Sequence, residues 1–440
     1  MMKSLKYLFL LLLAPLLFGA CKKDHPVEIS NEIRRTVLVY VAGQNSLAYN
    51  GEQTRDSLEI VKGLSHLSPN DRLLLFIDDY YAPRMYEMAK GYSAPKRVRT
   101  WSEDVNSADA ETLTDVLRWT KVNYPSQEYG LVLWSHATGW VYGERTLTNN
   151  YTTKSIKSSP SLLTTQRNPL SFGIDVGPDG QMSRDKTADG KEPYEMDIEA
   201  LAGAIEKSNI RFRYILFDCC LMQGIEVLYT LRNAADYLAG SPISIAAEGG
   251  YYTDLMQNGL FAQDIRQLGD SYMKYYLEGR SDMGMVFSIV QTDQLETLAQ
   301  TIADVLPAKE VNPDNYNNTI FWNMTDVLQY AAYARNFFYR PHYFDMEEAL
   351  RKVLSESDFA RVKAAINAAV IYKNTTTSFW AGPGNWQYYN VNPDHYCGVS
   401  MFVPQNIYTL YAPNSIHGDH NENFRRTDWY KAAGWEAKGW

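Results

Sequence analysis

Short apolar runs alternate with helical patterns over the first 250 residues of the chain. The runs are continuous and rich in Leu, Val and Ile, which is typical of strands that are buried on both faces of a sheet. They predict strands at 36–41, 73–77, 131–134, 214–217 and 241–248. Apolar residues at helical spacing predict helices at 54–64, 110–124, 197–208 and 221–238. This alternation indicates an α/β fold, a mainly parallel sheet with helices on both faces.

The pattern changes at two places outside this alternation. PRMYEM and KRVRTW, at 83–88 and 96–101, predict an antiparallel ribbon. Beyond the alternating part, VFSIVQT and GVSMFVP predict strands, and 347–371 is largely helical in pattern. We therefore expect a core at 35–260 and a C-terminal α+β region at 261–440 that packs on it.

The N-terminus has the pattern of a secretory signal. Two lysines precede an apolar run at 8–18 that is too short to span a membrane. Cys21 directly follows Phe-Gly-Ala, which resembles the lipidation motif of bacterial lipoproteins; a plain signal peptide beside an unrelated cysteine is the alternative. We expect residues 1–20 to be removed, Cys21 to anchor the protein to the bacterial cell envelope through a lipid, and 21–34 to form a polar tether.

The net charge and the cysteines narrow the range of functions. A formal charge of −9 over 440 residues argues against a nucleic acid as partner. Of the four cysteines, three remain if Cys21 is lipidated, so at least one thiol has no partner within the chain. Cys219 and Cys220 are adjacent, and neighbours cannot form a disulfide of ordinary geometry. Because Cys397 is expected to be a buried, inert residue, the adjacent pair is the candidate for thiol chemistry.

Two predicted strands end close to residues that can perform chemistry. The strand at 131–134 runs into His136, and the strand at 214–217 runs into Cys219 and Cys220. In an open parallel sheet, sites form beyond the carboxyl ends of the strands. A predicted helix follows the cysteines, and its N-terminal dipole would favour a thiolate, while an imidazole would serve as general base and acid. The alternative is that the histidine is structural.

Longer stretches of the sequence resemble the clostripain family of cysteine peptidases. TVLVYVAGQNSL resembles the first strand and turn of that family, and DVNSADAETLTDVLRWTKVNYPSQEYGLVLWSHATGW resembles its helix, strand and histidine block. FDCCLMQGIEVLYTLRNAADYLAGS is similar to the block around its catalytic cysteine, and GVSMFVP and RRTDWYKAAGW resemble its C-terminal segments. These matches follow one another in order over most of residues 35–435.

The resemblance implies a fold and a reaction. The fold would be a caspase-like α/β/α sandwich, and the reaction would be peptide cleavage through an acyl-enzyme, with Cys220 as nucleophile and His136 as its acid–base partner. Cys219 falls on an alanine position of the family and is expected to be a bystander. The backbone N–H groups of Ala137 and Cys220 would hold the oxyanion. No cofactor is required by this chemistry.

The resemblance also implies a substrate class, protein or peptide chains with Arg or Lys at P1. Asp218 would line the site for that basic side chain, because a carboxylate pairs with a guanidinium through strong, directional hydrogen bonds. Glu248 would assist it. The alternative is that Asp218 only caps the helix that follows.

The polar stretch at 142–195 is much too long for an ordinary connection. The resemblance implies self-cleavage at a basic residue of this loop, with candidates Arg145, Lys154, Lys157, Arg167, Arg184, Lys186 and Lys191. Some members of the family use calcium, and this loop offers the oxygen donors Asp175, Asp179, Asp185 and Asp189. Their spacing does not match a calcium-binding loop, so we predict no metal site there.

Three positions depart from the family pattern. Ala137 stands where the family usually has glycine, which would cost about 1 kcal/mol or more if that position needs a positive φ. Gln44 stands in place of an aspartate, and residues 247–249 read Ala-Glu-Gly in place of Ser-Glu-Glu. These departures leave open a catalytically silent homologue, a lipoprotein that binds peptides or a protein partner. An acyl transferase, which differs from the peptidase only in its acceptor, is open as well.

Overall fold

A computed structural model describes most of the chain. The described residues are 33–140, 171–190, 193, 195–309, 324, 326–335, 338–381, 388–405, 408–409 and 420–440. The predicted signal peptide, Cys21 and most of the predicted tether lie outside these ranges. None of the helices within them combines the length and the apolar character needed to cross a membrane.

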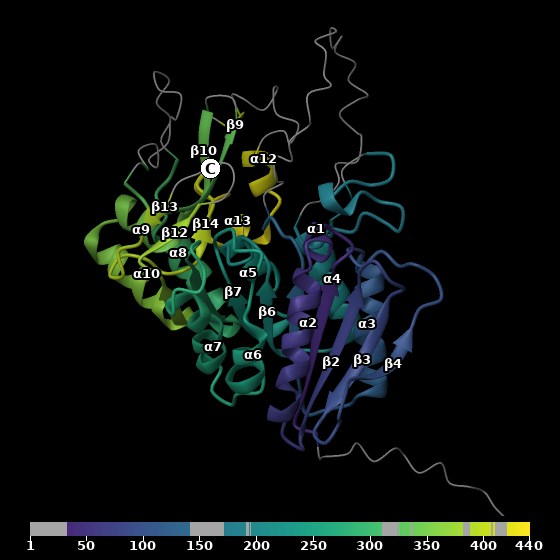
Figure 1. Ribbon diagram of the computed structural model, residues 1–440. Helices are drawn as coiled ribbons and strands as arrows, with labels where there is room; N and C mark the ends of the chain where they lie inside the picture. The colour runs from purple at the N-terminus through teal and green to yellow at the C-terminus, as the bar shows by residue number, and fades with distance from the viewer. Residues whose placement is uncertain are drawn as a thin grey trace, which may run out of the picture.

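A nine-stranded sheet forms the centre of the molecule (Figure 1). Its strands in spatial order are β11 (Val370–Thr375), β8 (Val286–Gln291), β7 (Ala235–Gly240), β6 (Phe212–Asp218), β5 (Glu128–Trp134), β1 (Arg35–Ala42), β2 (Asp71–Asp78), β3 (Arg84–Ala89) and β4 (Lys96–Thr100). The neighbours from β7 to β2 pair in parallel, and the outer pairs on both sides are antiparallel. The prediction of a mainly parallel central sheet is therefore confirmed.

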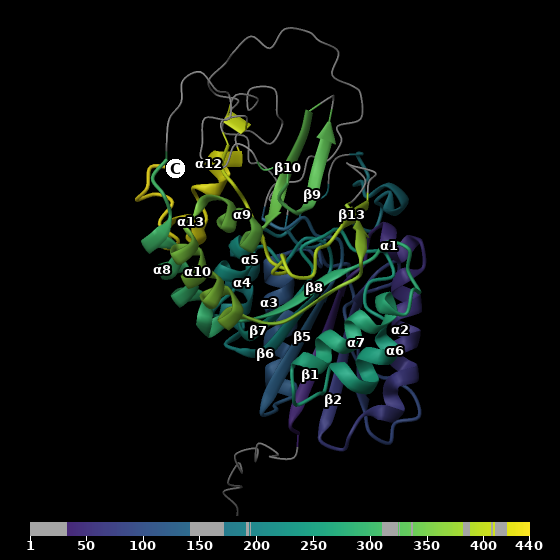
Figure 2. The same cartoon turned by 90° about the vertical axis from the view of Figure 1, so that its left-hand side faces the viewer.

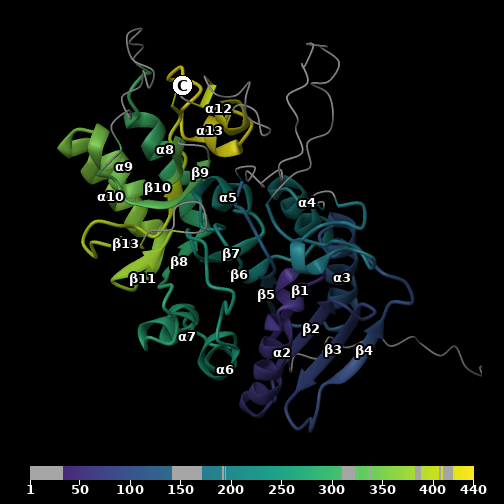
Figure 3. The same cartoon turned by 45° about the horizontal axis from the view of Figure 1, so that its top comes forward.

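Helices cover both faces of this sheet (Figures 1 and 3). One face carries α2 (Glu52–Lys62), α6 (Tyr252–Asp254) and α7 (Arg266–Leu277), and the other carries α3 (Ala110–Asn123), α4 (Ile198–Ser208) and α5 (Ile225–Thr230). All eight residues of β1 are buried, as expected for a strand that has helices on both sides. The architecture is the α/β/α sandwich that the sequence predicts.

The chain beyond residue 260 extends the main sheet and adds a second region. It supplies β8 and β11 to the main sheet, and it forms a three-stranded sheet, β14-β10-β9, near the carboxyl ends of the central strands (Figure 2). The strands of this smaller sheet are β14 (Ser400–Met401), β10 (Phe338–Asp345) and β9 (Gln329–Arg335). The region also contains the helices α8 (Leu295–Val305), α9 (Met346–Val353), α10 (Glu356–Ala369), α12 (His420–Phe424) and α13 (Asp428–Ala432), and the paired strands β12 (Ser378–Trp380) and β13 (Tyr388–Asn390). The short helix α1 (Ser46–Tyr49) follows β1.

Aspartates at two helix starts explain where those helices begin. Asp109 accepts a hydrogen bond from the N–H of Glu111 at 2.7 Å, at the start of α3. Asp197 accepts one from the N–H of Ala200 at 2.6 Å, at the start of α4. Each carboxylate satisfies an N–H group that has no partner inside the helix, and each offsets the positive end of the helix dipole.

Most predicted elements are present, and two are wrong. β1, β2, β5 and β6 contain the first four predicted strands, and β3 and β4 form the predicted ribbon. The predicted helix at 221–238 is wrong, because α5 ends at Thr230 and the strand β7 begins at Ala235. β7 pairs with β6 and with β8, so sheet pairing overrides the helical pattern of these residues. The predicted strand at 241–248 is also wrong; these residues form a loop.

The pairing of β5 with β6 places the loops that carry the candidate residues side by side. β5 and β6 pair with Trp134 opposite Asp218. His136 lies two residues beyond Trp134, and Cys220 lies two residues beyond Asp218. Both therefore leave the sheet at the same edge, the carboxyl edge of the parallel strands, where α/β proteins place their sites.

Candidate active site

The loop that carries His136 is held from two sides. Ser135 donates a hydrogen bond from Oγ to the carbonyl oxygen of Ala42 at 2.7 Å, which ties the loop to β1. Ala137 and Phe172 form an antiparallel bridge, flanked by bonds of 3.0 Å from Gly173 N–H to the carbonyl of His136 and from Thr138 N–H to the carbonyl of Ser171. In such a pair the N–H of Ala137 points away from Phe172. It is therefore directed away from the 171–173 segment.

The expected backbone strain at Ala137 does not arise. Among the described residues, the non-glycine positions with positive φ are Asp185, Asn209 and Leu221. Ala137 is not among them, so alanine fits this backbone without the cost that we expected. The departure from glycine therefore does not argue for a damaged site.

A serine and an aspartate orient the imidazole of His136. Nε2 of His136 and Oγ of Ser46 are hydrogen-bonded at 3.0 Å, and Ser46 donates its hydroxyl proton to Oδ2 of Asp185 at 2.9 Å. The N–H of Ser46 also donates to Oδ1 of Asp185 at 2.7 Å. Because the hydroxyl has one proton and gives it to the carboxylate, Oγ accepts from Nε2–H of His136. Nδ1 is then the ring nitrogen that can accept a proton.

Neither Ser46 nor the role of Asp185 was found from the sequence. Ser46 lies in the turn after β1, and Asp185 lies in the long loop, where it was noted only as a calcium donor. Asp185 has a φ of 50°, an uncommon conformation for a residue with a side chain. A single aspartate far along the chain gives no sequence signal that it will meet a strand-end histidine.

The loop that carries Cys220 contacts the histidine loop. Leu221, the next residue, has a φ of 63°, which turns the chain sharply after the cysteine. Gly139 has a φ of 74°, and a Cβ atom there would lie 2.9 Å from the carbonyl oxygen of Leu221. Only glycine allows this approach of the two backbones. The two predicted catalytic residues therefore lie on loops that contact each other.

Burial keeps the thiol of Cys220 protonated. Desolvation raises its pKa to about 11; a hydrogen bond from the N–H of Ile245, at 3.3 Å from Sγ, opposes this shift, and the negative charge of Asp218 adds to it. The sequence-based expectation that a helix dipole favours the thiolate is wrong, because α5 starts only at Ile225 with Gly224 as its N-cap. The resting site therefore holds a thiol that needs a base.

Alkylation of Cys220 is expected to reflect this raised pKa. Only the thiolate reacts, and its fraction rises about tenfold per pH unit below the pKa. The rate constant for iodoacetamide modification should therefore rise about tenfold per unit between pH 7 and pH 9. Mass spectrometry of the peptide that contains Cys220, at a series of pH values, measures it. A rate that is constant from pH 6 to pH 8 would show a thiolate–imidazolium pair instead.

The other two described cysteines are buried. Cys219 is 1% exposed, and burial raises the pKa of its thiol well above the ordinary value. Cys397 is also 1% exposed and donates from Sγ to Oδ2 of Asp345 at 3.3 Å. All three described cysteines are unpaired. Cys219 and Cys397 are buried, as the sequence predicts, and the role of Cys219 as a bystander stays a prediction.

Asp218 is enclosed by hydrogen-bond donors. Its Oδ1 accepts from the N–H of Gly250 at 2.8 Å and from the hydroxyl of Tyr272 at 2.9 Å, and its Oδ2 accepts from the hydroxyl of Tyr252 at 2.8 Å. It is 3% exposed, and burial raises its pKa. It does not cap α5, whose N-cap is Gly224, so that alternative is wrong.

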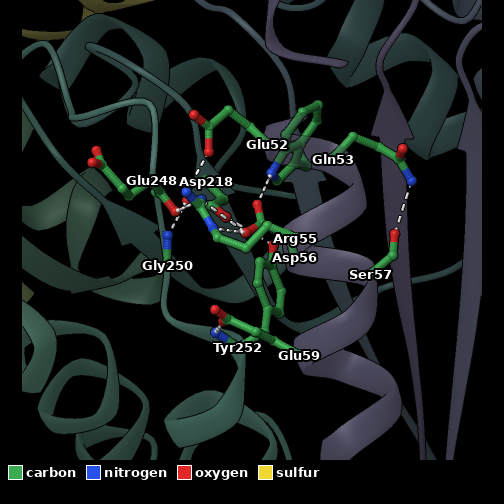
Figure 4. A network of polar contacts seen from close by, with 12 residues as sticks. Glu52, Gln53, Arg55, Asp56, Ser57, Glu59, Asp218, Glu248, Gly250 and Tyr252 are labelled. Carbon is green, nitrogen blue, oxygen red and sulfur yellow. Dashed lines mark hydrogen bonds and ion pairs between the residues drawn. The ribbon is translucent and has the colours of Figure 1, made fainter. Parts of the chain in front are cut away.

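Glu248, predicted to assist Asp218, contacts Arg55 through its backbone and not through its carboxylate. Its carbonyl oxygen accepts a hydrogen bond at 2.8 Å from the guanidinium of Arg55 on α2 (Figure 4). Gly249, the next residue, has a φ of 56°, and a Cβ there would lie 2.7 Å from Oδ1 of Asp218. The 248–250 segment is thus packed directly onto the buried carboxylate.

The aspartates considered for calcium bind different partners. Asp175 accepts from Ser107 N–H at 2.6 Å, Asp185 binds Ser46, and Asp189 accepts from the hydroxyl of Thr187 at 2.7 Å. Within the ranges that the structure describes, no group of three or more His, Cys, Asp or Glu residues is arranged to hold a metal ion. The absence of a metal site in the whole loop stays a prediction.

Most candidate residues for self-cleavage lie outside the described ranges. Arg145, Lys154, Lys157, Arg167 and Lys191 belong to this group. Arg184 is exposed and Lys186 is half-buried, and they flank the Asp185 that contacts Ser46. The structure does not single out one of the seven.

Comparison with known proteins places the chain among cysteine peptidases. The model of the clostripain family matches residues 39–156 and 184–440. A secreted C11 cysteine protease from Bacteroides thetaiotaomicron, solved with an irreversible peptide inhibitor, is 26% identical, with a TM-score of 0.70 over 92% of this chain and 99% of that one. An inactive zymogen C11 protease from Parabacteroides distasonis is 26% identical, with a TM-score of 0.67 over 91% of this chain and 98% of that one. No curated protein matches the sequence.

Proposed function

Because the chain belongs to the clostripain family of cysteine peptidases, we propose that it is an endopeptidase that cleaves after Arg or Lys through Cys220 and His136. The observation that carries this proposal is the meeting of the two strand-end loops, in which Gly139 of the histidine loop abuts Leu221 of the cysteine loop. The orientation of His136 by Ser46 and Asp185 supports it further.

The reaction follows from these positions. Nδ1 of His136 takes the thiol proton of Cys220 as Sγ bonds to the carbonyl carbon of the substrate. The C–N bond then breaks, and His136 returns the proton to the departing amine, which leaves a thioester. Water, deprotonated by the same imidazole, attacks the thioester carbon; the C–S bond breaks, and the imidazolium returns the proton to the departing thiolate. The carboxylic acid that is released then loses its proton to the solvent. The site starts and ends as a neutral thiol and a neutral imidazole, in keeping with the raised pKa of Cys220.

Backbone N–H groups are proposed to stabilise the oxyanion of the tetrahedral intermediate. The N–H of Ala137 points away from the 171–173 segment, and the N–H of Cys220 lies in the loop directly after β6. Amide donors that are fixed before the reaction pay no reorganisation cost when the charge develops.

Removal of the hydroxyl of Ser46 is expected to slow catalysis without weakening substrate binding. In Ser46→Ala, the imidazole loses the acceptor that fixes its tautomer and the link to the carboxylate that stabilises its charged form. We expect kcat to fall about tenfold, the worth of one hydrogen bond to a charged group, with little change in KM. Ser46→Thr, which keeps the hydroxyl, should restore kcat. Equal kcat values for Ala and Thr variants would rule out this role.

Peptide cleavage by the chain that begins after Cys21 tests the proposed function. Matched fluorogenic peptides with Arg, Lys or Asp at P1 should be cleaved only after Arg and Lys, and a gel of the protein over time should show whether it cuts itself within 142–195. An inert protein that also remains uncut would favour the silent, peptide-binding homologue. Products joined to an added amine instead of water would indicate an acyl transferase.

The anchor at Cys21 is a proposal as well. The solved relative from Bacteroides thetaiotaomicron is described as secreted, and an exported enzyme with lipid at Cys21 would act at the cell envelope. Cell fractionation decides it: the wild type should be found with membranes, and Cys21→Ala should leave them. The same distribution for both would exclude lipidation at this cysteine.

A further inference from the structure

A single arginine on α2 is surrounded by acidic groups (Figure 4). The guanidinium of Arg55 donates to Oδ1 of Asp56 at 3.0 Å and to the carbonyl oxygen of Glu248 at 2.8 Å, and it forms an ion pair with Glu52. Glu59 and Asp218 contribute further negative charge around it. We call Glu52, Asp56, Glu59, Asp218 and the Glu248 carbonyl the acidic cluster.

Asp56 is a buried acid whose charged form Arg55 favours. It is 3% exposed, and its second oxygen accepts from the indole N–H of Trp134 at 2.8 Å. Burial, together with the negative charge of Asp218, raises the pKa of Asp56 to about 8, and Arg55 acts against that rise. Without a cation beside it, the carboxylate would be a buried, poorly compensated charge.

The acidic cluster is tied to both halves of the proposed dyad. Trp134, which binds Asp56, is the register partner of Asp218 and lies two residues before His136. Asp218 lies two residues before Cys220. Glu248 follows closely after Ile245, whose N–H donates to the sulfur. Arg55 therefore bonds to the loop that also contacts the nucleophile.

The partners of Arg55 are those that a basic substrate side chain would need. A guanidinium is recognised by carboxylates and carbonyl oxygens arranged around its edges, and Arg55 already uses three of them. Asp218, expected to bind the substrate, is saturated by internal donors. We propose that Arg55 is an internal stand-in for the P1 arginine, a self-inhibitory and specificity-determining side chain that a basic substrate must displace. This inference rests on the proposed Arg/Lys specificity.

The geometry of Arg55 suits displacement. Its side chain is 36% exposed, and it reaches the cluster from the surface of α2 through a long, flexible stem. When it moves out, the carboxylate of Glu52, the side-chain oxygen of Asp56 and the carbonyl oxygen of Glu248 become open to a substrate cation. The exchange of one guanidinium for another keeps Asp56 compensated. Arg55 therefore competes directly with a basic P1 side chain for these groups, whereas a neutral P1 side chain gains little when Arg55 leaves them.

Matched substrates test the effect on specificity. Peptides with Arg or its uncharged isostere citrulline at P1 should be compared in wild type, Arg55→Ala and Arg55→Lys. We expect Arg55→Ala to raise the Arg-to-citrulline ratio of kcat/KM about tenfold or more, because the vacated position offers charge-assisted hydrogen bonds. Arg55→Lys should stay within about threefold of the wild type, since the cation is retained. A ratio that is unchanged or lower in Arg55→Ala overturns the proposal.

Binding of benzamidine to the chain that begins after Cys21 separates this inference from the proposed function. In the Cys220→Ala background, calorimetry should show that Arg55→Ala binds benzamidine at least about tenfold more tightly than the parent. Equal or weaker binding overturns the role of Arg55. If no variant cleaves any peptide, the proposed function fails, and this measurement still decides what Arg55 does.

Two further variants serve as controls, one for the general effect of removing an arginine and one for a failure of Arg55→Ala to fold. Arg232→Ala removes a half-buried arginine that pairs with Glu296 and Asp428, outside the acidic cluster, and should change neither readout. If Arg55→Ala does not fold, the double variant Arg55→Ala, Asp56→Asn removes the unpaired buried charge while it keeps Glu52 and the Glu248 carbonyl. It should still bind benzamidine more tightly than the parent, and no gain there contradicts the proposal.

Discussion

Replacement of Cys220 by alanine is expected to lower kcat/KM for a cleaved peptide by roughly 10⁴-fold or more, because no acyl-enzyme can form without the nucleophile. Cys219→Ala, one residue earlier, should keep most of the activity, because Cys219 is buried and its thiol has a pKa raised well above the ordinary value. Initial rates for the two variants, with equal folded protein verified by circular dichroism, make the comparison. The reverse pattern, in which Cys219→Ala is inactive and Cys220→Ala is active, would exchange the roles of the two cysteines.

Replacement of His136 by alanine is expected to have the second largest effect. The thiol of Cys220 has a raised pKa, so without a base almost none of it is ionised at neutral pH. Loss of the acid–base partner should lower kcat/KM about 10²–10⁴-fold. The residual activity should rise with pH, since hydroxide then supplies the thiolate directly.

His395→Ala is the matched control for the histidine. His395 is half exposed in the C-terminal region, near Glu348, and should not affect the rate. An equal loss of activity in His395→Ala would mean that the assay reports folding and not chemistry. Full activity in His136→Ala would leave Cys220 without the base that the proposed reaction needs.

The hydrophobic pattern predicted the centre of the fold because parallel strands have a simple signature. β1, β2, β5 and β6 are buried on both faces and read as continuous apolar runs. β7 has no such signature: its residues continue the helical spacing of α5, and only pairing with β6 and β8 makes them a strand. The local sequence pattern determines the secondary structure of a segment only when pairing with distant strands does not compete with it.

Some residues of the candidate site could be predicted from the sequence, and others could be recognised only in the structure. His136 and Cys220 were predicted because strand ends in a parallel sheet are marked in the sequence and because the flanking blocks resemble a known family. Ser46, Asp185 and Arg55 act through contacts between segments distant in sequence, such as the 2.9 Å bond from Ser46 to Asp185. No periodicity or motif marks such a contact. The pKa of Cys220 was mispredicted because its environment comes from the 241–250 loop and not from α5.

The enclosure of Asp218 bears on the proposed specificity for Arg or Lys. Asp218 already accepts three internal hydrogen bonds, so it would act on a substrate mainly through long-range electrostatic attraction. Direct hydrogen bonds to the substrate would come from the groups that now bind Arg55. Basic selectivity in this chain would then depend on the ease of moving Arg55, a surface residue of α2, as much as on the acidic residue before the nucleophile.

The most direct test of the central claim is the site of covalent capture by a peptide with Arg at P1 and an acyloxymethyl ketone at its carboxyl end. The labelled protein is digested, and mass spectrometry locates the modified cysteine. In the chain that begins after Cys21, we expect one adduct, on Cys220 in FDCCLMQG, that is lost in His136→Ala, although that variant, when denatured, still has three thiols that iodoacetamide can modify. Labelling of Cys219 or Cys397, or no labelling of a folded protein that cleaves peptides, would contradict it.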